Sequence, residues 1–204
     1  VDEWISFAHQ MKDAGTLFLL LTGGEPLLFP QFKELYCALK DMGMILTLNT
    51  NGTLINEEWA EFFAKNKPRR INITLYGSKN ETYENLCHMK DGFDKTIRGI
   101  ELLKKYKIDV KINGSLVKKN FHDRMEIIDI GEKYDIPVRI DTYMYPSVRE
   151  RTTPFNFHER LNPEDAAKAR VEILHREMGD ELFEQYAKQT IYLAEHTEEG
   201  DACP

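Results

Sequence analysis

Short apolar segments alternate with longer amphipathic ones from the start of the chain to about residue 145. Five segments rich in leucine, β-branched or aromatic residues have the length and composition of buried strands: Leu17–Leu21, Ile45–Thr50, Ile71–Tyr76, Val110–Val117 and Pro137–Tyr143. Five segments with helical periodicity lie before or between them: Glu3–Ala14, Phe32–Met42, Glu57–Lys65, Phe93–Tyr106 and Arg124–Tyr134. Because helix and strand alternate in this way, the pattern predicts an α/β fold with parallel strands and right-handed crossovers.

The alternation stops beyond the fifth predicted strand. A polar stretch then leads to Asn162-Pro163-Glu164, which has the form of an N-cap followed by proline at the first helical position. Two helices are expected beyond it, Glu164–Met178 and Glu181–Glu195. We therefore expect an α/β core over residues 1–146 and a helical extension over residues 147–204.

The wide gap between the third and fourth predicted strands holds a segment, Gly77–Asp91, that we expect to be an inserted loop. It follows the carboxyl end of its strand, where barrel enzymes build substrate contacts from loops. We expect its Cys87 to be a buried or incidental thiol and its His88 to face solvent or pack within the loop, because neither has a partner at metal-ligand spacing.

Charge and composition exclude some classes of function. The chain carries 34 acidic and 27 basic residues, a net charge of −7, which disfavours broad binding to nucleic acid. No apolar run approaches the ~20 residues of a membrane span, and no secretory signal is visible. The three cysteines, Cys37, Cys87 and Cys203, are far apart and odd in number, which indicates a reducing compartment without a disulfide framework. We expect a cytoplasmic protein with no nucleic-acid or membrane partner.

The strongest candidate for chemistry is Thr22-Gly23-Gly24-Glu25-Pro26, which directly follows the first predicted strand. The carboxyl ends of parallel strands are where ligands bind. Gly23 and Gly24 carry no Cβ and leave the backbone open to a ligand. Glu25 supplies an anionic acceptor, and Pro26 fixes the turn. This arrangement suits a ligand with a positively charged amine beside polar groups, and the alternative is an ordinary turn with a solvated glutamate.

The same five residues, followed by Thr50-Asn51-Gly52 at the end of the next strand, resemble the radical S-adenosylmethionine enzymes. The chain is similar in particular to the branch with a cysteine-rich C-terminal extension, the SPASM/twitch group, which includes peptide-modifying maturases. Further segments carry the resemblance: Ile73–Gly77, Glu81–Glu84, Asp91–Leu103, Val117–Asn120 and Arg160–Glu164.

The resemblance implies a partial (β/α)6 TIM-like barrel. In such enzymes a CxxxCxxC loop holds a [4Fe-4S] cluster with one open iron, which S-adenosylmethionine binds through its amino and carboxylate groups. Reductive cleavage then gives a 5′-deoxyadenosyl radical, which takes a hydrogen atom from the substrate. A peptide or small-molecule substrate is implied for this branch, and auxiliary [4Fe-4S] clusters are implied in a further C-terminal region.

The resemblance also assigns residues, all of them to S-adenosylmethionine and none to metal. Gly23-Gly24-Glu25-Pro26 matches the binding site for the methionine amino group. Thr50 and Asn51 are placed to approach the nucleoside, and Thr74 to meet the ribose or the carboxylate. Ser115 on the fourth strand is a further candidate.

The chain departs from the family at one point that decides its activity. It contains no CxxxCxxC motif, so we expect that this piece cannot build the principal cluster and is inactive alone. It also begins almost inside a helix, at Val1-Asp2-Glu3-Trp4, without the first strand that should pair with Leu17–Leu21. We therefore expect a fragment of a longer enzyme whose open strand edge makes it self-associate.

Several alternatives stay open. A metal-dependent barrel hydrolase or aldolase would need clustered His and Asp ligands or a catalytic lysine at strand ends, which the sequence lacks. A non-catalytic peptide-binding scaffold differs from the enzyme in having no CxxxCxxC upstream of Val1. Tyr76 stands where many relatives carry an aspartate, and ring packing is its expected role. Arg139 needs an anionic partner, either the carboxylate of a bound cosubstrate or a neighbouring aspartate.

Overall fold

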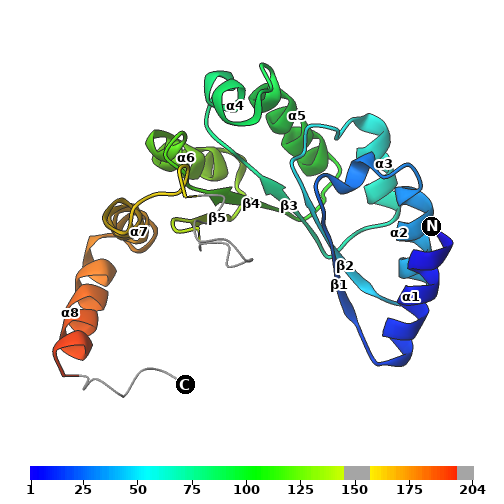
Figure 1. Cartoon of the computed structure of the whole chain (residues 1–204), viewed down its shortest axis with the longest axis horizontal. Coiled ribbons are helices and arrows are strands. Elements are labelled where there is room, and N and C mark those ends of the chain that lie inside the picture. Colours follow the sequence, from blue (N-terminus) through cyan, green and yellow to red (C-terminus); the bar gives the residue numbers. More distant parts are fainter. Residues whose placement is uncertain (145–156, 197–204) are drawn as a thin grey trace. The chain divides into compact units, whose positions relative to one another are not determined.

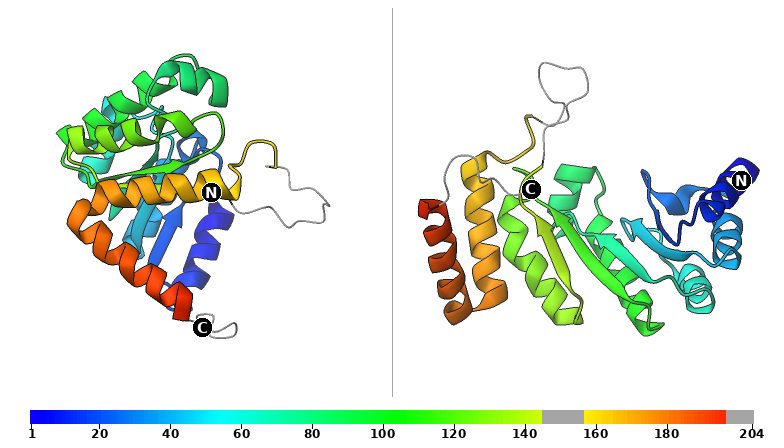
Figure 2. Two further views of the ribbon diagram at one scale, coloured as in Figure 1. Left: turned by 90° about the vertical axis from the view of Figure 1, so that its left-hand side faces the viewer. Right: turned by 90° about the horizontal axis from the view of Figure 1, so that it is seen from below.

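The computed structural model describes residues 1–144 and 157–196, and the chain divides into two compact units, Val1–Arg160 and Leu161–Pro204. The described part of the first unit is built on a sheet of five parallel strands that are hydrogen-bonded in chain order. The strands are β1 (Phe18–Leu21), β2 (Ile45–Thr50), β3 (Arg70–Thr74), β4 (Val110–Ser115) and β5 (Val138–Asp141). Figure 2 shows them following one another from blue β1 to yellow-green β5. The predicted parallel α/β fold is confirmed.

Six α-helices accompany the strands in the described part of this unit: α1 (Asp2–Asp13), α2 (Phe32–Asp41), α3 (Glu57–Lys65), α4 (Asn80–Cys87), α5 (Gly92–Lys105) and α6 (Arg124–Tyr134). Two short 3-10 helices follow the carboxyl ends of β1 and β4: η1 (Pro26–Leu28) and η2 (Phe121–Asp123). The helices gather on one side of the sheet (Figure 1). The N-terminus of α3 is capped by Asn56, whose Oδ1 accepts a hydrogen bond from the backbone N–H of Trp59 at 3.0 Å.

Side chains alternate between two faces along each strand. One face is buried and apolar, with side chains no more than 1% exposed: Leu46, Leu48, Ile71, Ile73 and Ile112. In β2, β3 and β4 most side chains on the opposite face are polar and partly exposed: Thr47, Asn49, Asn72, Lys111 and Asn113. Parallel sheets are usually covered on both faces and apolar throughout. Here the described helices cover one face, which explains the alternation and leaves a polar face uncovered by them (Figure 1).

The second unit contains α7 (Pro163–Met178) and α8 (Asp180–His196). The Oδ1 of Asn162 accepts a hydrogen bond from the backbone N–H of Asp165 at 2.7 Å, which confirms the predicted cap with proline at the first helical position. The expected boundary between residues 146 and 147 lies outside the described residues. Within the described ranges, no helix has the length and apolar character needed to cross a membrane.

Most element boundaries agree with the sequence pattern, and β2, α3 and α6 have the predicted bounds. The prediction of an inserted loop over Gly77–Asp91 is wrong, because α4 occupies residues 80–87 and buries Thr82 and Tyr83. The Oδ1 of Asn80 accepts a hydrogen bond from the backbone N–H of Phe93 at 3.0 Å. This bond joins the first turn of α4 to the first turn of α5, so tertiary packing stabilises a helix too short to be stable alone.

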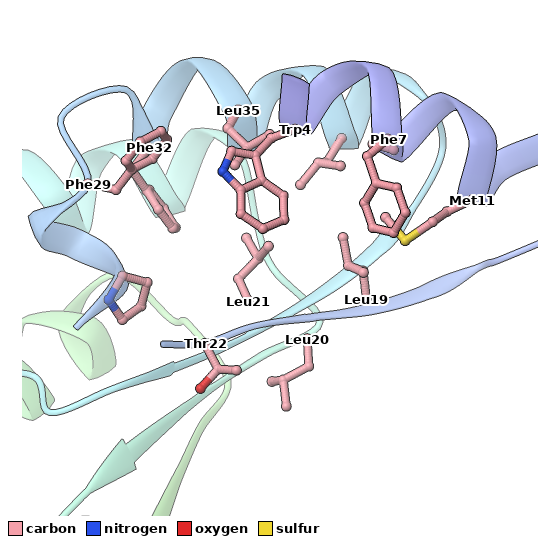
Figure 3. A pocket seen from close by; sticks show the side chains of 13 residues that line it. Trp4, Phe7, Met11, Leu19, Leu20, Leu21, Thr22, Phe29, Phe32 and Leu35 are labelled. Atoms are coloured by element: carbon pink, nitrogen blue, oxygen red, sulfur yellow. The ribbon is translucent and has the colours of Figure 1, made fainter. Parts of the chain in front are cut away.

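An apolar cavity of about 430 Å³ lies between α1, β1 and α2. Figure 3 shows Trp4 and Phe7 of α1 facing Leu19 and Leu21 of β1, whereas Thr22 points to the other side of the strand. The cavity therefore lies on the helix-covered side of the sheet. Its apolar lining belongs to the packing of α1 against β1, since polar groups that would orient a ligand are scarce there.

The turn after β2 packs directly against α5. Gly52 in this turn has a φ of +75°, in the left-handed region that favours glycine. Gly99 of α5 faces it so closely that a Cβ on Gly99 would lie 2.5 Å from the Gly52 carbonyl oxygen. Only a glycine at position 99 lets the helix approach this backbone, and the approach fixes the carboxyl end of β2.

We expect Gly99→Ala to lower the free energy of unfolding. The overlap with the Gly52 backbone costs roughly 1–3 kcal/mol, which outweighs the gain in helix propensity of at most about 1 kcal/mol. Chemical denaturation measures the change. The matched control is Gly114→Ala, a buried glycine whose Cβ would come no closer than 3.4 Å to the Ile140 side chain. Equal stability of the two variants would contradict the close approach.

Candidate functional site

The carboxyl ends of β1 and β2 meet at the Glu25 carboxylate. Its Oε1 accepts hydrogen bonds from the Thr50 hydroxyl at 2.7 Å and from the backbone N–H of Leu27 at 3.2 Å. Its Oε2 accepts one from the backbone N–H of Asn51 at 2.8 Å. A carboxylate offers about four acceptor positions, so Oε2 keeps one. Within the described residues no Lys, Arg or His side chain forms an ion pair with Glu25.

The backbone beside Glu25 is open. Gly23 and Gly24 are exposed, and a Cβ built on either glycine would meet nothing within 4 Å. Glu25 is the N-cap of η1 and Pro26 stands at its first position, so the direction of the turn is set locally. A ligand therefore has access to both the glycine backbone and the remaining acceptor of Glu25, and the residues present fit a cationic amine.

Thr50 and Asn51 act in different ways. Thr50 is 3% exposed on the helix-covered face, and its hydroxyl is used by Glu25. The Asn51 Oδ1 accepts hydrogen bonds from the backbone N–H of Thr53 at 2.9 Å and from the Thr53 hydroxyl at 2.7 Å. In the described part of the chain the Nδ2 of Asn51 has no partner. Asn51 thus retains a donor for a ligand, whereas Thr50 reaches a ligand only through Glu25.

Thr74 and Ser115 lie at the ends of β3 and β4, on the face that the described helices leave uncovered. Thr74 is in register with Asn113 of β4, and Ser115 is in register with Asp141 of β5. Both side chains are partly exposed. The structure places Thr74 two strands away from Glu25 and Ser115 three strands away, so a compact ligand on Glu25 meets Thr74 more readily than Ser115.

Asn120 is not among the site residues predicted from the sequence, although it ends a segment that carries the family resemblance. It is 0% exposed. Its Nδ2 donates to the carbonyl of Tyr76 at 2.9 Å and to the carbonyl of Ser115 at 3.1 Å. Its Oδ1 accepts from the backbone N–H of Val117 at 2.7 Å. This amide therefore fixes the carboxyl ends of β3 and β4 relative to each other.

Asp123, which is also absent from the site residues predicted from the sequence, holds the start of α4. It is 2% exposed, and its Oδ2 accepts hydrogen bonds from the Thr82 hydroxyl at 2.6 Å and from the backbone N–H of Ser78 at 3.0 Å. Its Oδ1 lies 3.2 Å from the Nε2 of His122. Burial by itself raises the pKa of Asp123, but the bonds from Thr82 and Ser78 and the charge of His122 outweigh it and hold the pKa below its usual value.

Two further residues singled out by the sequence have clear partners. The ring of Tyr76 packs edge-on against Tyr83 with centroids 5.9 Å apart. Burial raises the pKa of Tyr76, and the nearby Cys87 and Glu25 raise it further. Arg139 pairs with the neighbouring Asp141, with Nε to Oδ1 at 3.2 Å. Of the two partners considered for Arg139, the structure shows the aspartate.

The described residues do not fit an iron–sulfur cluster. Such a cluster needs several thiolates, and no group of three His, Cys, Asp or Glu side chains able to hold a metal occurs among residues 1–144 and 157–196. Cys37 and Cys87 are half-buried free thiols, and burial raises the pKa of Cys87. Cys203 lies outside the described residues.

Comparison with known proteins gives concordant matches. Residues 1–131 match the model of the Radical SAM superfamily. The AdoMet-dependent heme synthase of Methanosarcina barkeri is 30% identical over 132 residues, 65% of this chain and 38% of that protein. A cysteine-type anaerobic sulfatase-maturating enzyme of Clostridium novyi is 33% identical over 108 residues, 48% of this chain and 28% of that protein. The solved structure of native anSMEcpe with bound AdoMet and Cp18Cys peptide has a TM-score of 0.68 at 23% identity, covering 84% of this chain and 50% of that one.

The open glycine turn and the Glu25 carboxylate lie at the carboxyl end of a parallel strand, which is where α/β proteins generally bind ligands. The chain belongs to the Radical SAM superfamily, which confirms the recognition made from the motifs. The matched relatives named above are enzymes, and the solved structure shares the fold. The matched segments span only about a third of the length of those curated relatives.

We expect Asp123→Asn to flatten the pH dependence of stability below about pH 4. A lowered pKa in the folded state adds stability that is present above the usual value near 3.8 and lost as the pH falls through the lowered value. Chemical denaturation at a series of pH values measures this. Thr82→Val removes one donor and should move the loss to higher pH. An unchanged profile in both variants would contradict the assignment.

Proposed function

We propose that the whole protein is a radical S-adenosylmethionine enzyme in which this chain binds S-adenosylmethionine through Gly23, Gly24, Glu25 and Pro26. The observation that carries the proposal is the Glu25 carboxylate, which is half-buried and keeps one acceptor position. Partial burial of an anion is costly unless it is paired. The ammonium group of the methionine moiety would supply the missing cation beside an accessible glycine backbone.

The other predicted residues take different roles in this proposal. The Nδ2 amide of Asn51 approaches the nucleoside, and Thr50 orients Glu25 from the buried side. Thr74 meets the ribose or the carboxylate from the uncovered face. Ser115 lies on the next strand and is a further candidate for contact with S-adenosylmethionine.

The principal [4Fe-4S] cluster would be held by cysteines outside this chain and would supply the electron for reductive cleavage of the sulfonium. We propose that this chain alone is therefore inactive, and that auxiliary clusters belong to a further region of the whole protein. The proposed substrate is a peptide or protein of the cytoplasm, in line with the sulfatase-maturating relative and with the peptide in the anSMEcpe structure. A small molecule is the alternative that the heme synthase relative favours.

We expect Glu25→Gln in the whole protein to weaken S-adenosylmethionine binding by about tenfold to a hundredfold without loss of cluster iron. A charge-assisted hydrogen bond contributes roughly 1.5–3 kcal/mol. Asn51→Ala should have a smaller effect, since a neutral hydrogen bond contributes roughly 0.5–1.5 kcal/mol. Calorimetric titration measures both affinities.

Glu25 also holds the turn, so a control for structure is needed. Thr50→Val removes the bond from the Thr50 hydroxyl to Glu25 but keeps the negative charge. It should weaken binding less than Glu25→Gln at a similar loss of thermal stability. If both variants lose affinity equally, the carboxylate acts only through the position of the turn. If wild-type protein with a full cluster does not bind S-adenosylmethionine, the chain is a scaffold and the proposal fails.

We also propose that this chain self-associates along β1. Phe18 and Leu20 are 68% and 48% exposed on the face without described helices. Among the described residues β1 pairs with β2 alone, so its other edge presents free backbone donors and acceptors.

Light scattering should therefore give a mass above that of the monomer for this chain. Phe18→Lys with Leu20→Lys should shift the mass to that of the monomer, because charges on an edge strand oppose pairing. Leu28→Lys is the matched control, since Leu28 is an apolar side chain 68% exposed outside the strand. A monomeric wild-type chain would refute this proposal.

A further inference from the structure

Thr96 and Tyr83 are buried hydroxyl-bearing residues to which no role has yet been given. Thr96, on α5, is 0% exposed, and Tyr83, on α4, is 1% exposed. Neither lies at the carboxyl end of a strand, where ligand-binding motifs of parallel α/β folds occur. A buried hydroxyl destabilises a protein unless it is hydrogen-bonded, which makes the partners of these two hydroxyls informative.

The two hydroxyls form a series of hydrogen bonds from the end of β3 to the end of β2. The backbone N–H of Tyr76 donates to the Tyr83 Oη at 3.2 Å, and the Tyr83 hydroxyl donates to the Thr96 Oγ1 at 3.3 Å. The single Thr96 hydroxyl hydrogen is shared between two carbonyl acceptors, Asn51 at 3.1 Å and Gly92 at 2.9 Å. All donors in this series of hydrogen bonds point the same way, an arrangement in which each bond polarises the next.

The series of hydrogen bonds ends at Asn51, the residue whose backbone N–H also donates to Glu25. The N–H of Asn51 donates to the Glu25 Oε2 at 2.8 Å, and the carbonyl of the same residue accepts from Thr96. The backbone of Asn51 is thus fixed from both sides, by a carboxylate on its amide and by a buried hydroxyl on its carbonyl. Its side-chain Nδ2, which has no partner in the described part of the chain, takes its position from this backbone.

The residues around Tyr83 leave room for its ring and keep its hydroxyl protonated. A Cβ on Gly92 would lie 2.4 Å from the Tyr83 Cδ1, so the ring occupies its place only because residue 92 is glycine. Burial raises the pKa of Tyr83 to about 12, so its hydroxyl keeps the proton that it donates at neutral pH.

We propose that Thr96 and Tyr83 are positioning residues for S-adenosylmethionine, which act by fixing the Asn51 backbone against Glu25. The inference rests on the proposed function and deepens it, because it assigns part of the binding affinity to two helix residues that touch no ligand. Loss of either hydroxyl should loosen residues 51–53 and weaken binding, although Glu25 and Asn51 themselves are intact.

The test compares four variants. Thr96→Val and Tyr83→Phe each remove one hydroxyl at nearly constant volume. Thr96→Ser keeps the hydroxyl and should restore wild-type behaviour. Tyr36→Phe is the matched control, because Tyr36 is also 0% exposed and its hydroxyl donates to the carbonyl of Asn66 at 2.8 Å, in the packing of α2 on α3. It should lower stability and leave the site unchanged.

The first measurement is hydrogen exchange of the backbone amides of residues 51–53 and 76 in this chain without ligand. We expect faster exchange in Thr96→Val and Tyr83→Phe, and wild-type rates at these positions in Thr96→Ser and Tyr36→Phe. The second is calorimetric titration of the whole, cluster-loaded protein with S-adenosylmethionine. We expect the dissociation constant to rise about three- to tenfold in Thr96→Val and Tyr83→Phe only.

The outcomes separate the two claims. Wild-type protein that fails to bind S-adenosylmethionine refutes the proposed function, whereas faster exchange in Thr96→Val still supports the positioning of Asn51. If the wild type binds and Thr96→Val and Tyr83→Phe bind equally well, the inference is overturned. It is also overturned if Thr96→Ser loses affinity as Thr96→Val does, or if Tyr36→Phe weakens binding, because general loss of packing would then explain the effect.

Discussion

The hydrogen bonds of the Glu25 carboxylate fix two strand ends relative to each other, and the candidate site depends on that constraint. β1 and β2 pair only as far as Leu21 and Leu48, and beyond these residues each chain enters its own turn. Glu25 accepts from both turns, and bonds to a charged acceptor are about twice as strong as neutral ones. The open Gly23-Gly24 backbone, which would otherwise be the most mobile part of the site, is thereby held at one end.

A different group performs the same task two strands further along. Asn120 donates to the carbonyls of Tyr76 and Ser115 and fixes the ends of β3 and β4. The difference in chemistry follows from the partners, because N–H groups need an acceptor and carbonyls need a donor. The Asn120 amide can donate to both carbonyls at the ends of β3 and β4, whereas the N–H groups beside Glu25 need an acceptor, which a carboxylate provides. Under the proposed function, a cationic group is recognised at the Glu25 carboxylate, beside the ends of β1 and β2.

The sequence predicted the strands and most helices because hydrophobic periodicity reports directly on which face is buried. It failed at α4, where Thr82 and Tyr83 become buried only through packing on residues distant in sequence. Side chains alternate between the two faces of β2, and this alternation places Thr50 on the buried face with Leu46 and Leu48. The motif that contains Thr50 suggests ligand contact instead. The roles of Asn120 and Asp123 could not be predicted, since their partners lie up to 45 residues away.

The uncovered face of the sheet sets the order in which a ligand would meet chemical groups. At β1 the face is apolar, with Leu20 exposed. Across β2 and β3 it carries amides that satisfy each other, since the Nδ2 of Asn72 donates to the Oδ1 of Asn49 at 2.7 Å. At β5 it ends in the ion pair of Arg139 and Asp141. Among the described residues Glu25, at the β1 end, has no ion pair with a Lys, Arg or His side chain. Under the proposed function, the cationic end of an extended ligand would be directed to β1, and its neutral polar groups would lie over β2 and β3.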